Sequence, residues 1–185
     1  MQPIRLECKK LHLAHAGDIS HRSAPNCADT RYDTMLAALL LTAAVANFDV
    51  YRFFAGETAG VGELKVVLRS REPVRVKGTG RIDPDGTLIL DQEIAQGTRP
   101  LRTRQWRLRR VGPSRYQGSL SDARGMVNGD VDGPRLHLRF ASKDGFDVEQ
   151  WLTLADDGRS ASNTLKARRF GVTVATLTET ITKLN

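Results

Sequence analysis

The sequence predicts an all-β fold: a single antiparallel, up-and-down β-barrel of about ten strands over residues 47–185. From Gly62 onward, apolar and polar residues alternate with a period of two, which is typical of half-buried strands. Turn residues recur roughly every 10–12 residues, so that most strands are joined by hairpin-length connections. Closing such a meander into a barrel leaves no exposed strand edge.

The residues ahead of the barrel read as two further segments. Residues 1–34 are polar and aperiodic, and we interpret them as a disordered leader. Such a leader would arise if the start codon had been assigned upstream of the true one, at or near Met35. Residues 35–46 are apolar but shorter than the roughly 20 residues that cross a bilayer. They end in Ala44-Val45-Ala46, the small-x-small pattern of a signal peptidase site. Export to the periplasm or cell envelope is therefore expected; the alternative is a cytoplasmic protein whose residues 35–46 form a short helix packed on the barrel.

The turns are predicted by their chemistry. In Asp83-Pro84-Asp85-Gly86, proline presets φ and glycine supplies the positive φ that closes the turn. Similar turn sequences follow near residues 112–114, 132–134, 143–145 and 156–158. The last two strands are expected from about 161 to 169 and from 172 to 183.

Alternation also predicts the inner face. The apolar residues expected to point inward are Leu64, Val66, Leu68, Val74, Val76, Ile82, Leu88, Leu90, Ile94, Trp106, Leu108, Tyr116, Leu120, Leu136, Leu138, Phe140, Val148, Leu152 and Leu154. The glycines expected at inner positions are Gly78, Gly80, Gly118, Gly125 and Gly129. Inner glycines allow strands to coil sharply, and they also enlarge a cavity, so both explanations stay open.

An ordered set of short motifs runs through residues 48–184. It comprises Phe54-Ala-Gly56 with Gly60 and Gly62, Gly86-Thr-Leu88 with Asp91, Arg104-Gln-Trp106-Arg-Leu108, Tyr116-Gln-Gly118, Asp122-Ala-Arg-Gly125 with Gly129 and Gly133, Glu149-Gln-Trp151, and Lys166-Ala-Arg-Arg-Phe170-Gly171-Val172. The set resembles an uncharacterised bacterial envelope family, domain of unknown function 3833. The resemblance implies a lipocalin-like (calycin-type) small barrel that is often carried on a lipoprotein and has no established activity. No cysteine follows the apolar run, so the lipid-attachment site of that pattern is absent from residues 35–185.

The strongest candidate for a ligand site is the strand around Trp106. Alternation places Arg102, Arg104 and Trp106 on one face, where a guanidinium can contact the indole ring. The arginine either plugs one barrel end by stacking on Trp106 or receives the anionic head of an amphipathic ligand. Tyr116, Glu149 and Trp151 complete the candidate ligand-binding set, and Asp91, Asp122 and Glu149 are the candidate acidic partners of the buried arginine.

Other classes of function find less support. The net charge of +7 comes from basic residues that alternate with apolar ones and are mixed with acids, so a nucleic-acid surface is not predicted, while association with a membrane surface stays open. His137 is the sole histidine of residues 47–185 and is expected to face water, and no catalytic constellation, metal site or cofactor is predicted. We expect a barrel that binds a small amphipathic, lipid-like molecule; the alternative is an envelope module with a filled barrel and no ligand.

Overall fold

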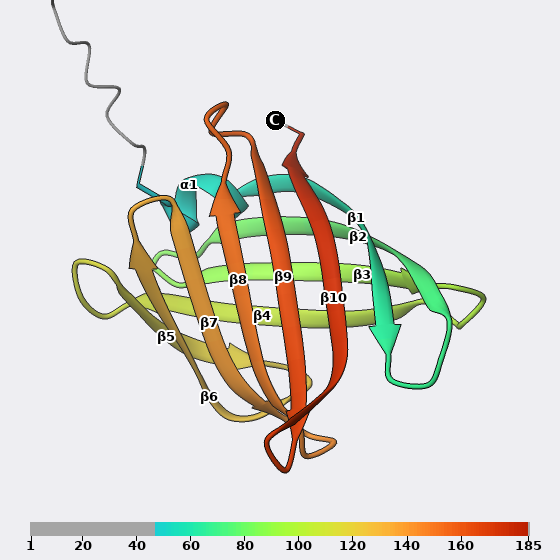
Figure 1. Cartoon of the computed structure of the whole chain (residues 1–185). Helices are drawn as coiled ribbons and strands as arrows, with labels where there is room; N and C mark the ends of the chain where they lie inside the picture. Colours follow the sequence, from blue (N-terminus) through green and yellow to red (C-terminus); the bar gives the residue numbers. More distant parts are fainter. Residues whose placement is uncertain (1–46, 185) are drawn as a thin grey trace, which may run out of the picture. The chain divides into compact units, whose positions relative to one another are not determined.

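Ten antiparallel strands close into a barrel in the computed structural model, which describes residues 47–184 (Figure 1). The elements are α1 (Val50–Phe54), β1 (Gly56–Val66), β2 (Arg71–Ile82), β3 (Leu88–Gln96), β4 (Arg102–Arg110), β5 (Arg115–Leu120), β6 (Ala123–Asp132), β7 (Arg135–Ser142), β8 (Asp147–Leu154), β9 (Ser160–Arg169) and β10 (Val172–Lys183). Each strand pairs with the next along the chain, and β1 pairs with β10 to complete the barrel. The predicted all-β, up-and-down barrel is thus confirmed, whereas residues 1–46 lie outside the described residues.

The inner face follows the predicted alternation closely. Trp106, Leu108 and Tyr116 are buried in one apolar cluster with residues of most other strands. Three inner positions were predicted wrongly. Leu68 lies in the β1–β2 connection and is exposed, and Ile82 is half-exposed because β2 ends there. Gly125 is exposed with a φ of 79°, since β6 has an irregular register against β7 between Arg124 and Asn128.

One end of the barrel is closed by α1. Asp49 caps this helix: its Oδ1 accepts hydrogen bonds from the backbone N–H groups of Tyr51 at 3.0 Å and Arg52 at 3.1 Å. The helix buries Val50, Phe53 and Phe54 against the core. It approaches β2 so closely that a Cβ on Gly80 would lie 1.8 Å from the carbonyl oxygen of Phe54, so a glycine is required there.

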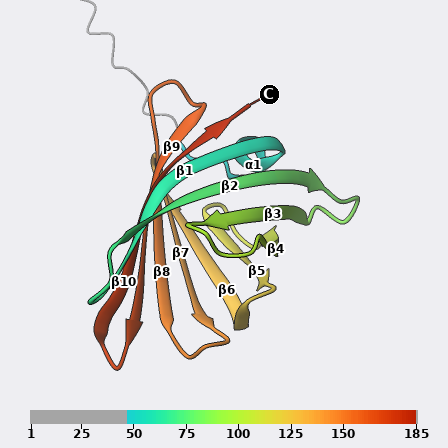
Figure 2. The same ribbon diagram turned by 90° about the vertical axis from the view of Figure 1, so that its right-hand side faces the viewer.

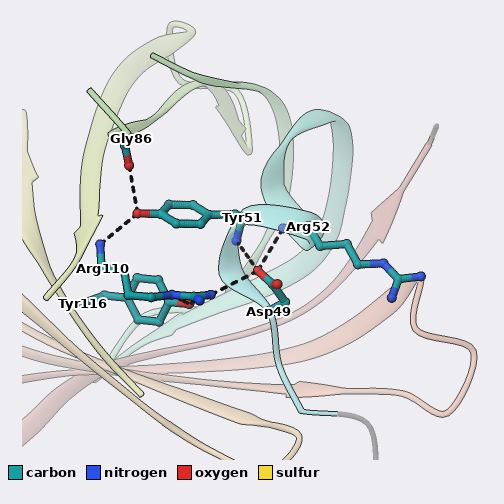
Figure 3. A network of polar contacts seen from close by, with 6 residues as sticks. All are labelled: Asp49, Tyr51, Arg52, Gly86, Arg110 and Tyr116. Carbon is teal, nitrogen blue, oxygen red and sulfur yellow. Dashed lines mark hydrogen bonds and ion pairs between the residues drawn. The ribbon is translucent and has the colours of Figure 1, made fainter. Parts of the chain in front are cut away.

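A network of polar contacts fixes α1 on the barrel (Figure 3). The Tyr51 hydroxyl donates to the carbonyl of Gly86 at 2.9 Å and accepts from the backbone N–H of Arg110 at 2.8 Å. The Arg110 side chain donates to the Tyr116 hydroxyl at 2.7 Å and lies 3.6 Å from the Asp49 carboxylate. These contacts join the helix to β4, β5 and the β2–β3 connection, so this end is held shut.

The opposite end, here called the open end, carries the connections β1–β2, β3–β4, β5–β6, β7–β8 and β9–β10. Figure 2 shows the β1–β2 and β9–β10 hairpins projecting there, away from α1. The backbone N–H of Val67 donates to the carbonyl of Val174 at 2.9 Å and links these two hairpins.

Candidate functional site

A band of polar side chains crosses the barrel interior between the aromatic core at α1 and the open end. Gln92, on β3, connects the side chains of this band. Its Oε1 accepts hydrogen bonds from Arg104 Nε at 2.7 Å and from Trp106 Nε1 at 2.8 Å. The Arg104 guanidinium lies 5.3 Å from the centroid of the Trp106 ring. A single amide oxygen therefore fixes both side chains of the predicted arginine–tryptophan face.

Two acids from other parts of the barrel, Asp122 in the β5–β6 connection and Glu179 on β10, attract the charge of Arg104. Burial lowers the pKa of Arg104 below its ordinary value, and the attraction of Asp122 and Glu179 opposes that effect. Of the three acidic partners predicted for this arginine, Asp122 is therefore placed to act on it. Asp91 instead accepts hydrogen bonds from Gln105 at 2.7 Å and Arg81 at 3.0 Å, away from Arg104.

Glu179 on β10 is a buried carboxylate of this band. Its Oε2 accepts a hydrogen bond from Asn163 Nδ2 at 2.9 Å. Burial raises the pKa of the Glu179 carboxyl above its usual value, against the hydrogen bond from Asn163 and the charge of Arg104. The side chain fits because β1 has glycine beside it: a Cβ on Gly60 would lie 1.8 Å from Glu179 Oε1.

Three acceptor oxygens on β8–β10 lack a hydrogen-bond donor among the described residues. They are Gln150 Oε1, Asn163 Oδ1 and Glu179 Oε1. These three residues are 5%, 3% and 8% exposed, respectively. Glu179 is opposite Asn163, and Gln150 is two residues from Leu152, the partner of Asn163 on β8. An unpaired buried acceptor costs about 1–3 kcal/mol. This wall of the barrel can therefore receive donors from water or from a ligand.

A cavity of about 160 Å³ lies between the polar band and the open end. Its wall is mainly aliphatic: Leu64, Val74, Val76, Ile94, Leu165 and Leu177. The side chains of Gln96, Arg102 and Arg104 supply the polar part of the wall. An apolar space with two guanidinium groups on one side suits an amphipathic molecule with an anionic group.

The structure brings together only part of the predicted ligand-binding set. Arg102, Arg104 and Trp106 share the inner face of β4, as predicted. Tyr116 is also buried inside the barrel, but it belongs to the network that fixes α1 at the closed end. Glu149 and Trp151 alternate with the buried residues Val148, Gln150 and Leu152 on β8, so they face outward.

Glu149 and Trp151 belong to a cluster on the outer face of β7–β9. The His137 ring stacks on Trp151 with centroids 4.9 Å apart and an interplanar angle of 8°, and Lys166 Nζ lies 5.7 Å from the indole centroid. Glu149 accepts a hydrogen bond from Arg168 at 2.7 Å and lies 3.8 Å from His137 Nε2. His137 is on the predicted outer side, but it is half-buried because Trp151 covers it. Burial, followed by the charge of Arg139, lowers the pKa of this imidazole.

Sequence reasoning missed several members of the polar band. Gln92, Gln150, Asn163 and Glu179 all occupy inner positions of strands whose other inner residues are mostly apolar. A polar residue at an inner position is a readable signal, because burying it requires a partner. Following the alternation for polar as well as apolar residues would have found them.

Residues 47–184 contain neither a grouped set of metal ligands nor a membrane-spanning helix. No group of three or more histidine, cysteine, aspartate or glutamate side chains in this part of the chain is placed to hold a metal ion. No helix in the same range has both the length and the apolar character needed to span a bilayer.

Comparison with known proteins gives a family and a fold. The family model described as "Protein of unknown function (DUF3833)" matches residues 40–183. No curated protein matches the chain. Among solved structures, the S-type phycobiliprotein lyase CPES from Guillardia theta is similar with a TM-score of 0.57 and 9% identity, over 75% of this chain and 94% of the lyase. A DUF3598-family protein of unknown function from Nostoc punctiforme has a TM-score of 0.54 and 14% identity, over 75% of this chain and 50% of its own. At these identities the likeness concerns the fold alone, and it agrees with a lipocalin-like barrel.

Proposed function

The chain belongs to the DUF3833 family, and we propose that it binds a small amphipathic, lipid-like molecule at the open end of its barrel. The observation that carries the proposal is the aliphatic cavity of about 160 Å³ with Arg102 and Arg104 on its wall. The apolar part of the ligand lies among the aliphatic side chains, and its anionic group lies beside the two arginines.

The size of the cavity limits what enters it. An apolar protein cavity of about 150 Å³ holds a molecule the size of benzene. The cavity therefore takes one small ring or the end of a short alkyl chain, and the rest of the ligand extends through the open end. Full enclosure of a drug-sized ligand would need about 300–1,000 Å³.

The two arginines differ in how they are held. Arg104 is fixed by Gln92 and Trp106, so little conformational entropy is lost when it contacts an anion. Arg102 is exposed at the start of β4 and reaches the same cavity. Burial raises the pKa of Glu179, which weakens one of the two carboxylates, Asp122 and Glu179, that compete with an anionic ligand for Arg104. Together these features favour an anionic over a cationic head group.

The proposal is tested with three amphiphiles that share a ten-carbon chain and differ in head charge: decanoate, decanol and decyltrimethylammonium. Calorimetric titration of the purified protein should rank them in that order. Replacing Arg102 or Arg104 by methionine should lower the affinity for decanoate by about tenfold or more, because a charge-assisted hydrogen bond is lost. The affinity for decanol should stay nearly unchanged. Arg104→Met is a clean variant because Trp106 Nε1 continues to satisfy Gln92 Oε1.

A cavity-filling variant supplies the matched control. Val76 lines the cavity, and Val76→Phe should remove binding of both decanoate and decanol while the arginines stay in place. Binding that ignores head charge, or that survives Val76→Phe, would contradict the proposal. Extraction of protein purified from native cells, followed by mass spectrometry, would identify a retained ligand.

The second candidate is an envelope module with a filled barrel and no ligand. It is favoured by the closed half of the interior, which is filled with aromatic and aliphatic side chains from Phe48 to Ile181. In that case Arg104 serves only to stack on Trp106, none of the three amphiphiles binds, and Arg104→Met lowers the thermal stability alone.

We place either activity in the periplasm or cell envelope. The support is the signal-like sequence of residues 35–46, with its Ala44-Val45-Ala46 ending, ahead of the barrel.

A further inference from the structure

Two large apolar side chains stand exposed at hairpin tips of the open end. Leu68, in the β1–β2 connection, is 98% exposed, and Phe170, in the β9–β10 connection, is 93% exposed. Both hairpins project from the same end of the barrel in Figure 2, and the Val67–Val174 hydrogen bond joins them. Val67, Leu101 and Val172 add further exposed apolar side chains at this end.

The backbone at the two tips makes these side chains unusual. Leu68 has a φ of 63° and Phe170 a φ of 51°, and they are the two non-glycine residues of the described chain with positive φ. This conformation costs an L-residue about 1–2 kcal/mol, whereas glycine adopts it freely. The chain has glycine at other positive-φ positions, such as Gly86 and Gly158, but leucine and phenylalanine here. Neither side chain is buried in the protein, and the Phe170 ring meets only the guanidinium of its neighbour Arg169, 5.6 Å from the ring centroid, among the contacts of the described residues, so burial in the core does not compensate for the strain.

Basic residues flank each apolar tip. Arg69 follows Leu68, Arg168 and Arg169 precede Phe170, and Arg99 and Arg102 lie on either side of Leu101. Arg99 and Arg168 form ion pairs with Glu72 and Glu149, so attraction to an anionic surface depends on Arg69, Arg102 and Arg169. The connections at the two ends of the barrel differ in charge. Those of the open end contain Arg69, Arg99 and Lys143 against Asp122 and Asp144, whereas those at the closed end contain Asp83, Asp85, Asp156 and Asp157 against Arg159.

We propose that the open end docks on the surface of a membrane that contains anionic lipids, with Leu68 and Phe170 inserted among the lipids. Apolar residues that enter the interface and basic residues that meet anionic head groups are the two contributions that hold a protein on such a surface. The acidic connections at the closed end are repelled by the same surface and therefore favour this orientation. Basic residues flank each of the exposed apolar side chains, whereas a protein–protein interface has a contiguous apolar centre depleted of charge.

The docking surface does not depend on the proposed ligand site, although the two fit together. The cavity lined by Leu64 and Leu177 reaches the same end of the barrel as the two tips. A molecule taken from a bilayer would then enter the barrel without crossing bulk water.

The test measures binding of the full chain to sedimented vesicles of phosphatidylcholine alone and of phosphatidylcholine with 30% phosphatidylglycerol. The double variant Leu68→Asn/Phe170→Asn removes both apolar side chains and keeps residues that tolerate positive φ, so the hairpins retain their geometry. We expect binding to the anionic vesicles to fall by about tenfold or more in this variant. The double variant Arg69→Gln/Arg169→Gln should weaken binding to the anionic vesicles more at low salt than at high salt. High salt already screens the attraction between these arginines and the lipid head groups, so less remains to be lost there.

The matched control is Ile82→Asn, which removes an exposed apolar side chain at the closed end. This variant should bind vesicles as the wild-type protein does, and circular dichroism should show all variants folded. The proposal is overturned if the wild-type chain binds neither kind of vesicle, or if Ile82→Asn loses as much binding as the double variant. It is also overturned if the tips instead mediate self-association without lipid, seen in analytical ultracentrifugation as a dimer that Leu68→Asn/Phe170→Asn abolishes.

Discussion

Replacing Trp106 by alanine tests the assignment on which the site depends, namely that this strand turns its arginine–tryptophan face inward. The indole is 3% exposed, donates to Gln92 Oε1 at 2.8 Å, and packs edge-on against Phe140 with ring centroids 5.6 Å apart. The substitution therefore leaves a large cavity in the core, and truncating a buried tryptophan costs about 3–5 kcal/mol. Gln92 Oε1 keeps Arg104 Nε as a donor, so no buried acceptor is orphaned and the cost comes from packing.

A loss of that size is a large part of the 5–15 kcal/mol that stabilises an ordinary domain. With a urea m-value of about 2 kcal/mol/M, the midpoint of unfolding should fall by about 2 M. The assay is urea unfolding followed by far-UV circular dichroism, which does not rely on the tryptophan that is removed.

Trp151 provides the matched comparison, because the chain has two tryptophans and this one lies half-buried on the outer face. Trp151→Ala removes a stack on His137 and a contact with Lys166, and it should cost about 0.5–1.5 kcal/mol beyond a modest loss of buried area. If Trp106→Ala shifts the midpoint no more than Trp151→Ala does, the inward assignment of Trp106 is wrong.

Two further predictions concern charge and processing. Glu179→Gln keeps the hydrogen bond from Asn163 and removes a carboxylate whose folded-state pKa lies above the ordinary 4.5. Because the folded state then holds this proton more tightly than the unfolded chain does, wild-type stability falls as pH rises through that interval. In paired urea titrations the variant should therefore have the larger free energy of unfolding at pH 7, and the difference from wild type should shrink as the pH falls toward 4.5. A difference that does not change with pH would show that Glu179 is not the titrating group. If residues 35–46 are a signal segment, protein from native cells should begin near Asn47 in N-terminal sequencing, and retention of residues 1–34 would contradict this.

Local pattern was enough to predict the barrel and part of its interior. The inner positions of β4 follow from alternation alone, which predicts that Arg102, Arg104 and Trp106 share one inner face. The same rule on β8 places Val148 and Leu152 inside, which puts Glu149 and Trp151 outside. These two residues are part of the candidate ligand-binding set, but they do not line the cavity.

The structure of the closed end could not be predicted from local sequence pattern. Residues 50–54 make a helix of five residues, too short to show a period, and its stability comes from the Asp49 cap and from burial of Phe53 and Phe54. The contacts of Tyr51 with Gly86 and Arg110 join residues 35 and 59 positions apart in the chain. No local signal specifies such pairs.

The sequence by itself determined the strands, their alternation and most of the residues that face inward, because these depend on neighbours one or two positions away. The tertiary structure alone decided which inner residues meet across the barrel. Closure of β1 on β10 brings Gly60 beside Glu179 and sets Glu179 where it attracts Arg104 of β4. Closure likewise gathers Leu68 and Phe170, residues 102 positions apart, at one end of the barrel. These arrangements depend on the register and tilt of all ten strands together, which no segment of the chain encodes alone.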